Sequence, residues 1–167
     1  FEFVTNSIIW RNISENNIRY GLHFMFSHNN AYISNIFRHN GAGVAVMYTH
    51  GMKMYNNIFE ESWGDAAFGL LMKDITDSYI SGNRFIRNTS GIYMEGSSRI
   101  VMEKNIFQNN GWAIKMQGSC DDNTVVQNNF SGNTFDISTN SELVLNLFNN
   151  NYWDKYDGYD LNKDQLG

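Results

Sequence analysis

The chain has 167 residues, the length of one ordinary domain with its own core. It carries 12 Lys and Arg against 17 Asp and Glu, and this net charge of −5 argues against nucleic-acid binding, which needs a basic face. No apolar run is long enough to cross a membrane, so we expect no direct membrane insertion, and the single cysteine excludes an internal disulfide.

The chain opens in a strand-like stretch, FEFVTNSIIW, without the basic start and apolar core of a signal peptide. We therefore expect a part of a longer protein whose natural start is missing. Strands at such a cut present unpaired backbone groups, which favour pairing with another chain. Residues 1–20 are accordingly predicted to mediate self-association.

Two motifs recur along the chain with the same period of about 22 residues, which is typical of a solenoid. Both motifs take a longer step at the same place, between Phe59 and Phe85. One motif begins with a glycine or alanine, as in GLHFM at 21 and GVAVM at 43. The other is Asn-x-Phe, with its phenylalanine at Phe37, Phe59, Phe85, Phe107, Phe130 and Phe148.

Each repeat holds short apolar–polar alternations separated by Asn, Gly and Ser, which is the pattern of strands and turns. Three short strands in about 22 residues predict an all-β, right-handed parallel β-helix of about seven coils over residues 1–151. The chain contains 25 asparagines, and an inward Asn at a turn is expected to bond the Asn of the next coil.

The alternation also assigns side chains to the inside or the outside of the coils. The column that begins at Leu22 and the phenylalanine column, which ends at Phe148, are expected to point inward. The columns that begin at His23 and at Met25 are expected to face solvent, and the first of these includes Ala45.

Two segments depart from the period. The long coil carries four extra residues near SWGD at 62–65, and we expect either a tolerated bulge or a partner-docking loop that presents Trp63 and Asp65. After Asn151 the period ends. Residues 152–167 are predicted to form an irregular cap whose aromatic residues cover the open end of the coils: Tyr152, Trp153, Tyr156 and Tyr159.

The four-residue motif MFSH at residues 25–28 recurs as MYTH at residues 47–50, one coil later. Stacking would place Met25 over Met47 and His28 over His50. Thioether sulfur and imidazole nitrogen suit Cu(I), so these four residues are a candidate copper site, which His23 is placed to join. The alternative is that the motif repeats only because the chain repeats.

A second candidate metal site lies near the C-terminus. Asp160, Asn162 and Asp164 have the spacing of calcium-loop ligands, although Gln165 stands where such a loop has glycine. The alternative is a solvated acidic turn.

Catalytic residues are not apparent. The carboxylates of Asp74, Asp77, Asp121 and Asp122 lie at turns without forming stacked acid–base pairs, and no nucleophile or zinc spacing is present. We therefore expect that the protein is not an enzyme. A carbohydrate-binding or carbohydrate-cleaving β-helix remains the alternative function.

The chain resembles the NosD family from about Arg19 to Asp164, although this family usually has glycine in place of Gln165. The resemblance implies a periplasmic, non-enzymatic scaffold or carrier that helps assemble the copper–sulfide centre of nitrous oxide reductase. It also implies an ABC transporter and a copper-chaperone lipoprotein as partners. It rests on RYGLHFMFSHNN, GAGVAVMYTH, GDAAFGLLMKDITDS, GNRFIRNTSGIYMEG, GWAIKM, NTFDISTN and NYWDKYDGYDLNKD, which occur in the family's order.

Overall fold

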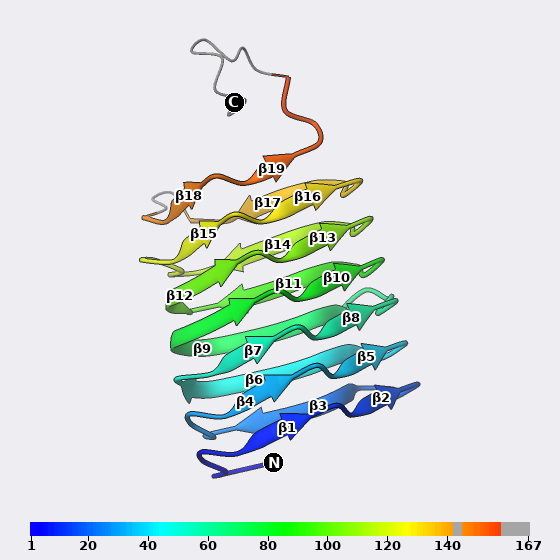
Figure 1. The fold of residues 1–167 in the computed structure, drawn as a ribbon, viewed down its shortest axis with the longest axis vertical. Coiled ribbons are helices and arrows are strands. Elements are labelled where there is room, and N and C mark those ends of the chain that lie inside the picture. The colour runs from blue at the N-terminus through cyan, green and yellow to red at the C-terminus, as the bar shows by residue number, and fades with distance from the viewer. Residues whose placement is uncertain (142–144, 158–167) are drawn as a thin grey trace.

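The computed structural model describes residues 1–141 and 145–157, which form a β-solenoid of parallel strands (Figure 1). One of its two sheets has seven strands, so about six full turns separate the first strand from the last. This architecture confirms the predicted all-β parallel β-helix. Within the described ranges there is no helix with the length and hydropathy of a membrane span.

Each coil contributes up to three strands. One side of the 12-stranded sheet contains β3 (Tyr20–Met25), β6 (Ala42–His50), β9 (Phe68–Ser81), β11 (Ser90–Glu95), β14 (Trp112–Gln117) and β17 (Phe135–Thr139). The adjoining side contains β1 (Ile8–Trp10), β4 (Ala31–Ile33), β7 (Lys53–Tyr55), the end of β9, β12 (Ser98–Glu103), β15 (Thr124–Val126) and β18 (Leu147–Asn149).

The seven-stranded sheet forms the third side. Its strands are β2 (Ile13–Glu15), β5 (Ile36–Arg38), β8 (Ile58–Glu60), β10 (Arg84–Ile86), β13 (Ile106–Gln108), β16 (Asn129–Ser131) and β19 (Tyr152–Trp153).

Phenylalanine rings stack along the axis inside this third side. The rings of Phe85 and Phe107 have centroids 4.9 Å apart and planes 7° apart, and Phe107 continues onto Phe130 in the same way. All three side chains are fully buried. The one-coil spacing of the Asn-x-Phe motif therefore produces a continuous aromatic column, which adds stacking to apolar burial.

A column of asparagines follows the inner side of the neighbouring corner; its members from Asn35 to Asn128 are buried, whereas Asn151 is half-buried and Asn12, in the first coil, is exposed. The Oδ1 atom of Asn83 accepts the backbone N–H of Asn57 at 2.8 Å. Its amide donates to the Met54 carbonyl at 3.0 Å and to Oδ1 of Asn105 at 3.1 Å. Each inward amide thus satisfies polar groups of the coils on both sides, as the asparagine excess predicted. The column comprises Asn12, Asn35, Asn57, Asn83, Asn105, Asn128 and Asn151.

Two assignments to the inside and the outside were wrong. Phe148 lies in β18, pairs with Val125 and is 38% exposed, while Trp153 takes the next place in the ring column, 4.3 Å from Phe130. The last Asn-x-Phe step is shorter than a full coil, which puts Phe148 on a different side of the solenoid. Ala45 is fully buried, because its short side chain lies between the larger His23 and Leu71 in its column.

The long coil accommodates its extra residues in the loop between β8 and β9. Ser62 keeps a fully buried inward position, so the four inserted residues are 63–66, one residue later than expected. At the C-terminal end, β19 still pairs with β16. The coils therefore continue to Trp153. Tyr159, one of the aromatic residues expected in the cap, lies outside the described residues.

Candidate functional site

The repeated motif lies at one corner of the solenoid, where β3, β11 and β14 end and which β6 and β9 cross without interruption. Met25 pairs with Met47, which pairs with Lys73, and the register continues through Glu95 to Gln117. We call this edge, comprising residues 25–28, 47–50, 73–76, 95–98 and 117–122, the corner strip. Its lower two coils carry the methionine–histidine motifs, and its upper three carry Lys-Asp-Ile-Thr, Glu-Gly-Ser-Ser and Gln-Gly-Ser-Cys.

The two methionines of the lower strip form an outward pair. Met25 and Met47 are Cα partners in adjacent parallel strands, and both side chains are half-buried. Neighbouring strands lie about 4.8 Å apart, so the two thioethers share one small area of surface. This register places both thioether side chains on the outer face of the solenoid, the side from which a soft ligand would approach.

The two histidines stack directly on each other. Their ring centroids are 4.0 Å apart and their planes differ by 17°. The backbone N–H of His50 donates to Nδ1 of His28 at 3.3 Å, and burial together with the neighbouring His50 lowers the pKa of His28. His28 is therefore neutral near pH 7, as a metal ligand must be. Because nitrogen lone pairs lie in the ring planes, one shared metal would require the rings to rotate.

A second aromatic pair separates the methionines from the histidines along the chain. Phe26 and Tyr48 stand at the turn itself, with φ angles of 49° and 53°, and their rings stack at 5.1 Å. The paired methionines thus lie on one side of the Phe26–Tyr48 corner, and the stacked histidines lie on the other side. In the described part of the chain, no group of three or more His, Cys, Asp or Glu is arranged to hold a metal.

His23 lies on the same face as Met25 and adds a nitrogen without a partner. Its Nε2 atom is buried and has no hydrogen-bond partner, and its ring packs 4.8 Å from that of Tyr20. Burial is the main cause that lowers the pKa of His23. A neutral imidazole with a free nitrogen two residues from Met25 fits the chemistry of a soft metal.

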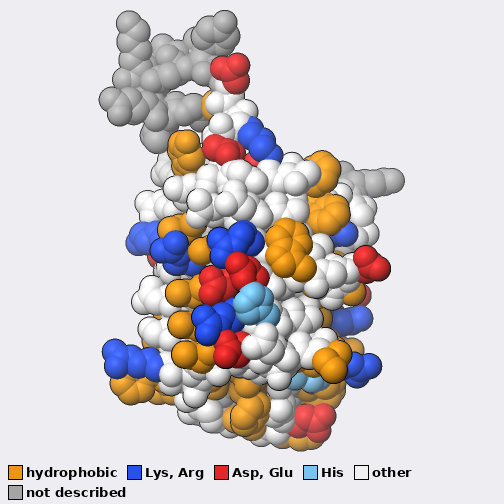
Figure 2. Space-filling model, turned by 90° about the vertical axis from the view of Figure 1, so that its right-hand side faces the viewer, with side chains coloured by type: hydrophobic (Ala, Val, Ile, Leu, Met, Phe, Trp, Pro, Cys, Tyr) orange, Lys and Arg blue, Asp and Glu red, His pale blue; other side chains and the backbone are white. Residues whose placement is uncertain are grey.

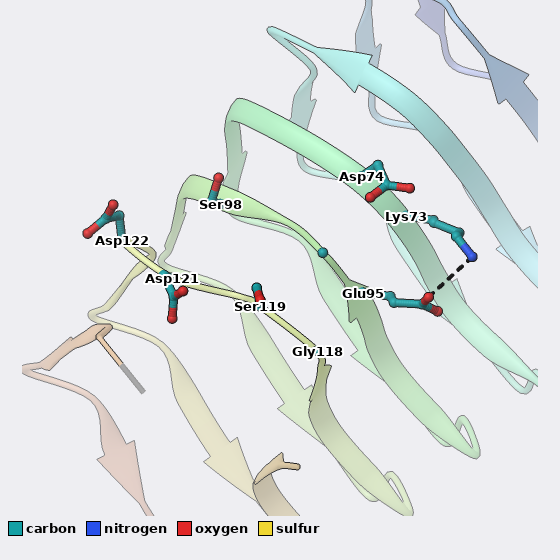
Figure 3. A pocket seen from close by; sticks show the side chains of 9 residues that line it. Lys73, Asp74, Glu95, Ser98, Gly118, Ser119, Asp121 and Asp122 are labelled. Atoms are coloured by element: carbon teal, nitrogen blue, oxygen red, sulfur yellow. Dashed lines mark ion pairs between the residues drawn. The ribbon is translucent and has the colours of Figure 1, made fainter. Parts of the chain in front are cut away.

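The upper strip is hollowed into a groove. Asp74, Glu95 and Asp121 line it from three successive coils, and Lys73 bonds Glu95 at 3.2 Å (Figure 3). The groove has a volume of about 680 Å³ and is also lined by Gly96, Ser98, Gly118, Ser119 and Asp122. The repeat pattern does not predict this groove, because missing side chains create it. The feature of the sequence that could have predicted the groove is the glycine in two later coils, Gly96 and Gly118, at the position that Phe26 and Tyr48 occupy in the earlier ones.

The predicted docking loop lies outside the corner strip. Trp63 is 60% exposed, and Asp65 is exposed beside it. The coil before this loop ends in Glu61, which is held by Arg87 at 2.5 Å and by His39 at 3.2 Å. Acidic and basic side chains alternate along the axis on this face (Figure 2). The predicted calcium ligands Asp160, Asn162 and Asp164 lie outside the described residues.

Comparison with known proteins gives one family match. The model of the NosD family, described as periplasmic copper-binding protein, matches residues 1–163. No curated protein matches the chain.

Several solved structures share the fold at low identity. A double mutant of the periplasmic alginate epimerase AlgG is 15% identical, with a TM-score of 0.69 over 91% of this chain and 44% of its own. The A-module of the Azotobacter vinelandii mannuronan C-5 epimerase AlgE4 is 16% identical, with a TM-score of 0.62 over 91% and 56%. DFA-IIIase from Arthrobacter chlorophenolicus, without its lid, is 13% identical, with a TM-score of 0.59 over 68% and 28%. The chain thus spans less than two thirds of each of these structures.

Proposed function

Because the chain belongs to the NosD family of periplasmic copper-binding proteins, we propose that its corner strip receives and passes on Cu(I). The observation that carries this proposal is the register of the repeated motif, which pairs Met25 with Met47 and stacks His28 on His50. Two thioethers and two imidazoles on one edge form a soft donor set that suits Cu(I).

The donor arrangement favours transfer over permanent storage. Methionine and histidine pairs on opposite sides of the Phe26–Tyr48 corner offer copper fewer ligands at once than a closed four-ligand cage. His28 must also release the 3.3 Å bond from the His50 amide before Nδ1 can bind metal. That bond is long and therefore weak, so its loss costs little. An exposed, partly assembled site suits exchange with a copper chaperone.

We further propose that the copper serves assembly of the copper–sulfide centre of nitrous oxide reductase. In this role the chain is a periplasmic scaffold without catalytic activity. It acts with an ABC transporter and a copper-chaperone lipoprotein. The support is the family membership together with an outward ligand set on a rigid solenoid. A carrier needs an accessible site on a surface that partners can approach, and the corner strip meets that requirement.

Anaerobic Cu(I) titration against a competing chelator tests the proposal. The outward double variant Met25→Leu, Met47→Leu should bind Cu(I) at least tenfold more weakly than the unchanged chain, because both thioethers are lost. The matched control is Met72→Leu, Met94→Leu, since these methionines are also paired in register but are fully buried. The control should keep the original affinity. Equal affinity of the outward variant and the unchanged chain would refute copper binding at this place.

A carbohydrate-binding function is the second candidate, since similar solved structures include alginate and mannuronan epimerases. Their identities to this chain are low, so the likeness carries the fold alone. The groove of the upper strip is the natural place for a sugar chain, yet Asp74, Glu95 and Asp121 would repel an acidic glycan. The groove therefore favours a different ligand class.

A further inference from the structure

The groove in the upper corner strip carries a net negative charge, because a single lysine, Lys73, lies among four carboxylates. Glu95 is matched by Lys73 at 3.2 Å, whereas Asp74, Asp121 and Asp122 have no ion pair in the described part of the chain. Asp77, one corner further along the same coil, is by contrast held by Arg99 at 2.7 Å. Asp74, Asp121 and Asp122 therefore line one hollow without a salt bridge of their own in the described part of the chain.

The shape of the groove follows from one column of residues at the turn. Phe26, Tyr48, Asp74, Gly96 and Gly118 all have φ angles between 49° and 65° and occupy equivalent places in successive coils. The column thus changes from aromatic rings through a carboxylate to two glycines. A Cβ at Gly118 would meet nothing within 4 Å, so the space there is open.

Tyr48 adds a feature that carboxylates alone lack. One face of its ring packs on Phe26; on the other face, toward the coil that carries Lys73 and Asp74, the described residues place no second ring and no cation–π contact, although Lys73 lies near enough to interact with Tyr48 electrostatically. The side chain is 40% exposed. An aromatic face next to a carboxylate attracts a guanidinium or ammonium group through both cation–π and ionic contacts. Ring and groove therefore favour the same kind of ligand.

We propose that this groove docks an extended, arginine- or lysine-bearing segment of a partner protein, with one cationic side chain against Tyr48 and Asp74. Its volume of about 680 Å³ holds two or three side chains and is too small for a folded domain. Charge complementarity selects a basic occupant, and a segment running along the axis meets carboxylates from three coils. The inference goes beyond the copper role and stands whether or not the methionine–histidine pairs bind metal.

The binding test uses the whole chain and three fluorescently labelled synthetic peptides, which alternate Ser with Arg, with Lys or with Glu. Binding of each peptide is measured by fluorescence anisotropy at low and at physiological salt. The basic peptides should bind and the acidic one should not. In Asp74→Asn, Asp121→Asn the dissociation constant should rise about tenfold, and in Tyr48→Ala about threefold. The control Glu60→Gln, Asp65→Asn removes the same charge far from the groove and should change binding less than twofold.

A shape test separates docking from general attraction. Gly118→Tyr fills the groove without changing its charge. The variant should fold, because Tyr48 already adopts the equivalent backbone conformation. It should abolish peptide binding. Four results would each overturn the proposal: no binding of a basic peptide, equal binding of the acidic peptide, equal weakening by the control, or displacement of the peptide by stoichiometric Ca²⁺. Cu(I) affinity measured in Asp74→Asn, Asp121→Asn and in Gly118→Tyr, which lie outside the methionine–histidine pairs, should stay unchanged, so failure here is distinguishable from failure of the copper proposal.

Discussion

The interior columns and the corner strip differ in how strictly they repeat. From Phe37 to Phe130 each coil contributes a phenylalanine to the same stack, and the asparagine column is as regular. The corner strip instead changes from methionine and histidine to carboxylates and glycine within five coils. Coil stacking thus constrains the inside in every layer, while the outer corner is free to carry chemistry.

The strongest way to break this comparison is to damage one ring of the interior. Phe107→Ala should lower the free energy of unfolding by about 3–5 kcal/mol, because it leaves a cavity between two stacked, fully buried rings. Tyr48→Ala at the exposed corner should cost less than about 1 kcal/mol. Urea denaturation followed by circular dichroism measures both. Comparable losses would show that the corner stack is also structural.

An asparagine of the inner column should matter next most. Asn83→Leu removes the acceptor of the Asn57 amide and the donor to the Met54 carbonyl. Each buried group left without a partner costs about 1–3 kcal/mol. The same denaturation experiment measures this loss of stability. Asn29→Leu would be a poor control, because the φ of 57° at Asn29 would add backbone strain to the change of side chain. Asn129→Leu, on an exposed strand position, is the better comparison and should have little effect.

The sequence predicted the interior better than the corner for a physical reason. A nearly constant period fixes which side chains stack, so the ring and asparagine columns followed from spacing alone. Phe148 was misplaced because the last Asn-x-Phe step is shorter than a full coil, so the motif leaves the ring column while the coils continue in register. At the corner, spacing paired Met25 with Met47 correctly, but it did not show that Phe26 and Tyr48 stand between the methionines and the histidines. The groove did not follow from the motifs, because Gly96 and Gly118 create it by having no side chain to fill the space.

The copper function of the lower strip should depend on pH in a defined direction. His28 has a pKa below its ordinary value of 6.5, so it stays neutral at pH 7 and protons compete with Cu(I) only in more acidic solution. Affinity should therefore be steady above about pH 7 and fall below about pH 6. Chelator competition at several pH values measures this profile. In His28→Asn, His50→Asn the fall should disappear, since thioethers do not titrate.

The smallest expected effect concerns the ion pair beside the strip. Hydrogen bonds from Arg99 and Thr76 lower the pKa of Asp77 from 3.8 to about 2. A carboxylate with a lowered pKa contributes stability that is present above its ordinary pKa and is lost as the pH falls toward the lowered value. Asp77→Asn should flatten the acid end of the stability profile and leave stability at pH 7 almost unchanged, because both partners are exposed. A clear loss at pH 7 would contradict this account.

The central claim is that Cu(I) binds at the lower corner strip through both methionine sulfur and histidine nitrogen. X-ray absorption at the copper edge of the chain loaded with one equivalent of Cu(I) tests it most directly. The account predicts a mixed shell of sulfur and nitrogen, which loses its sulfur component in Met25→Leu, Met47→Leu and its imidazole component in His28→Asn, His50→Asn. A shell that keeps the same sulfur and nitrogen content in both variants would place the copper elsewhere and contradict the claim.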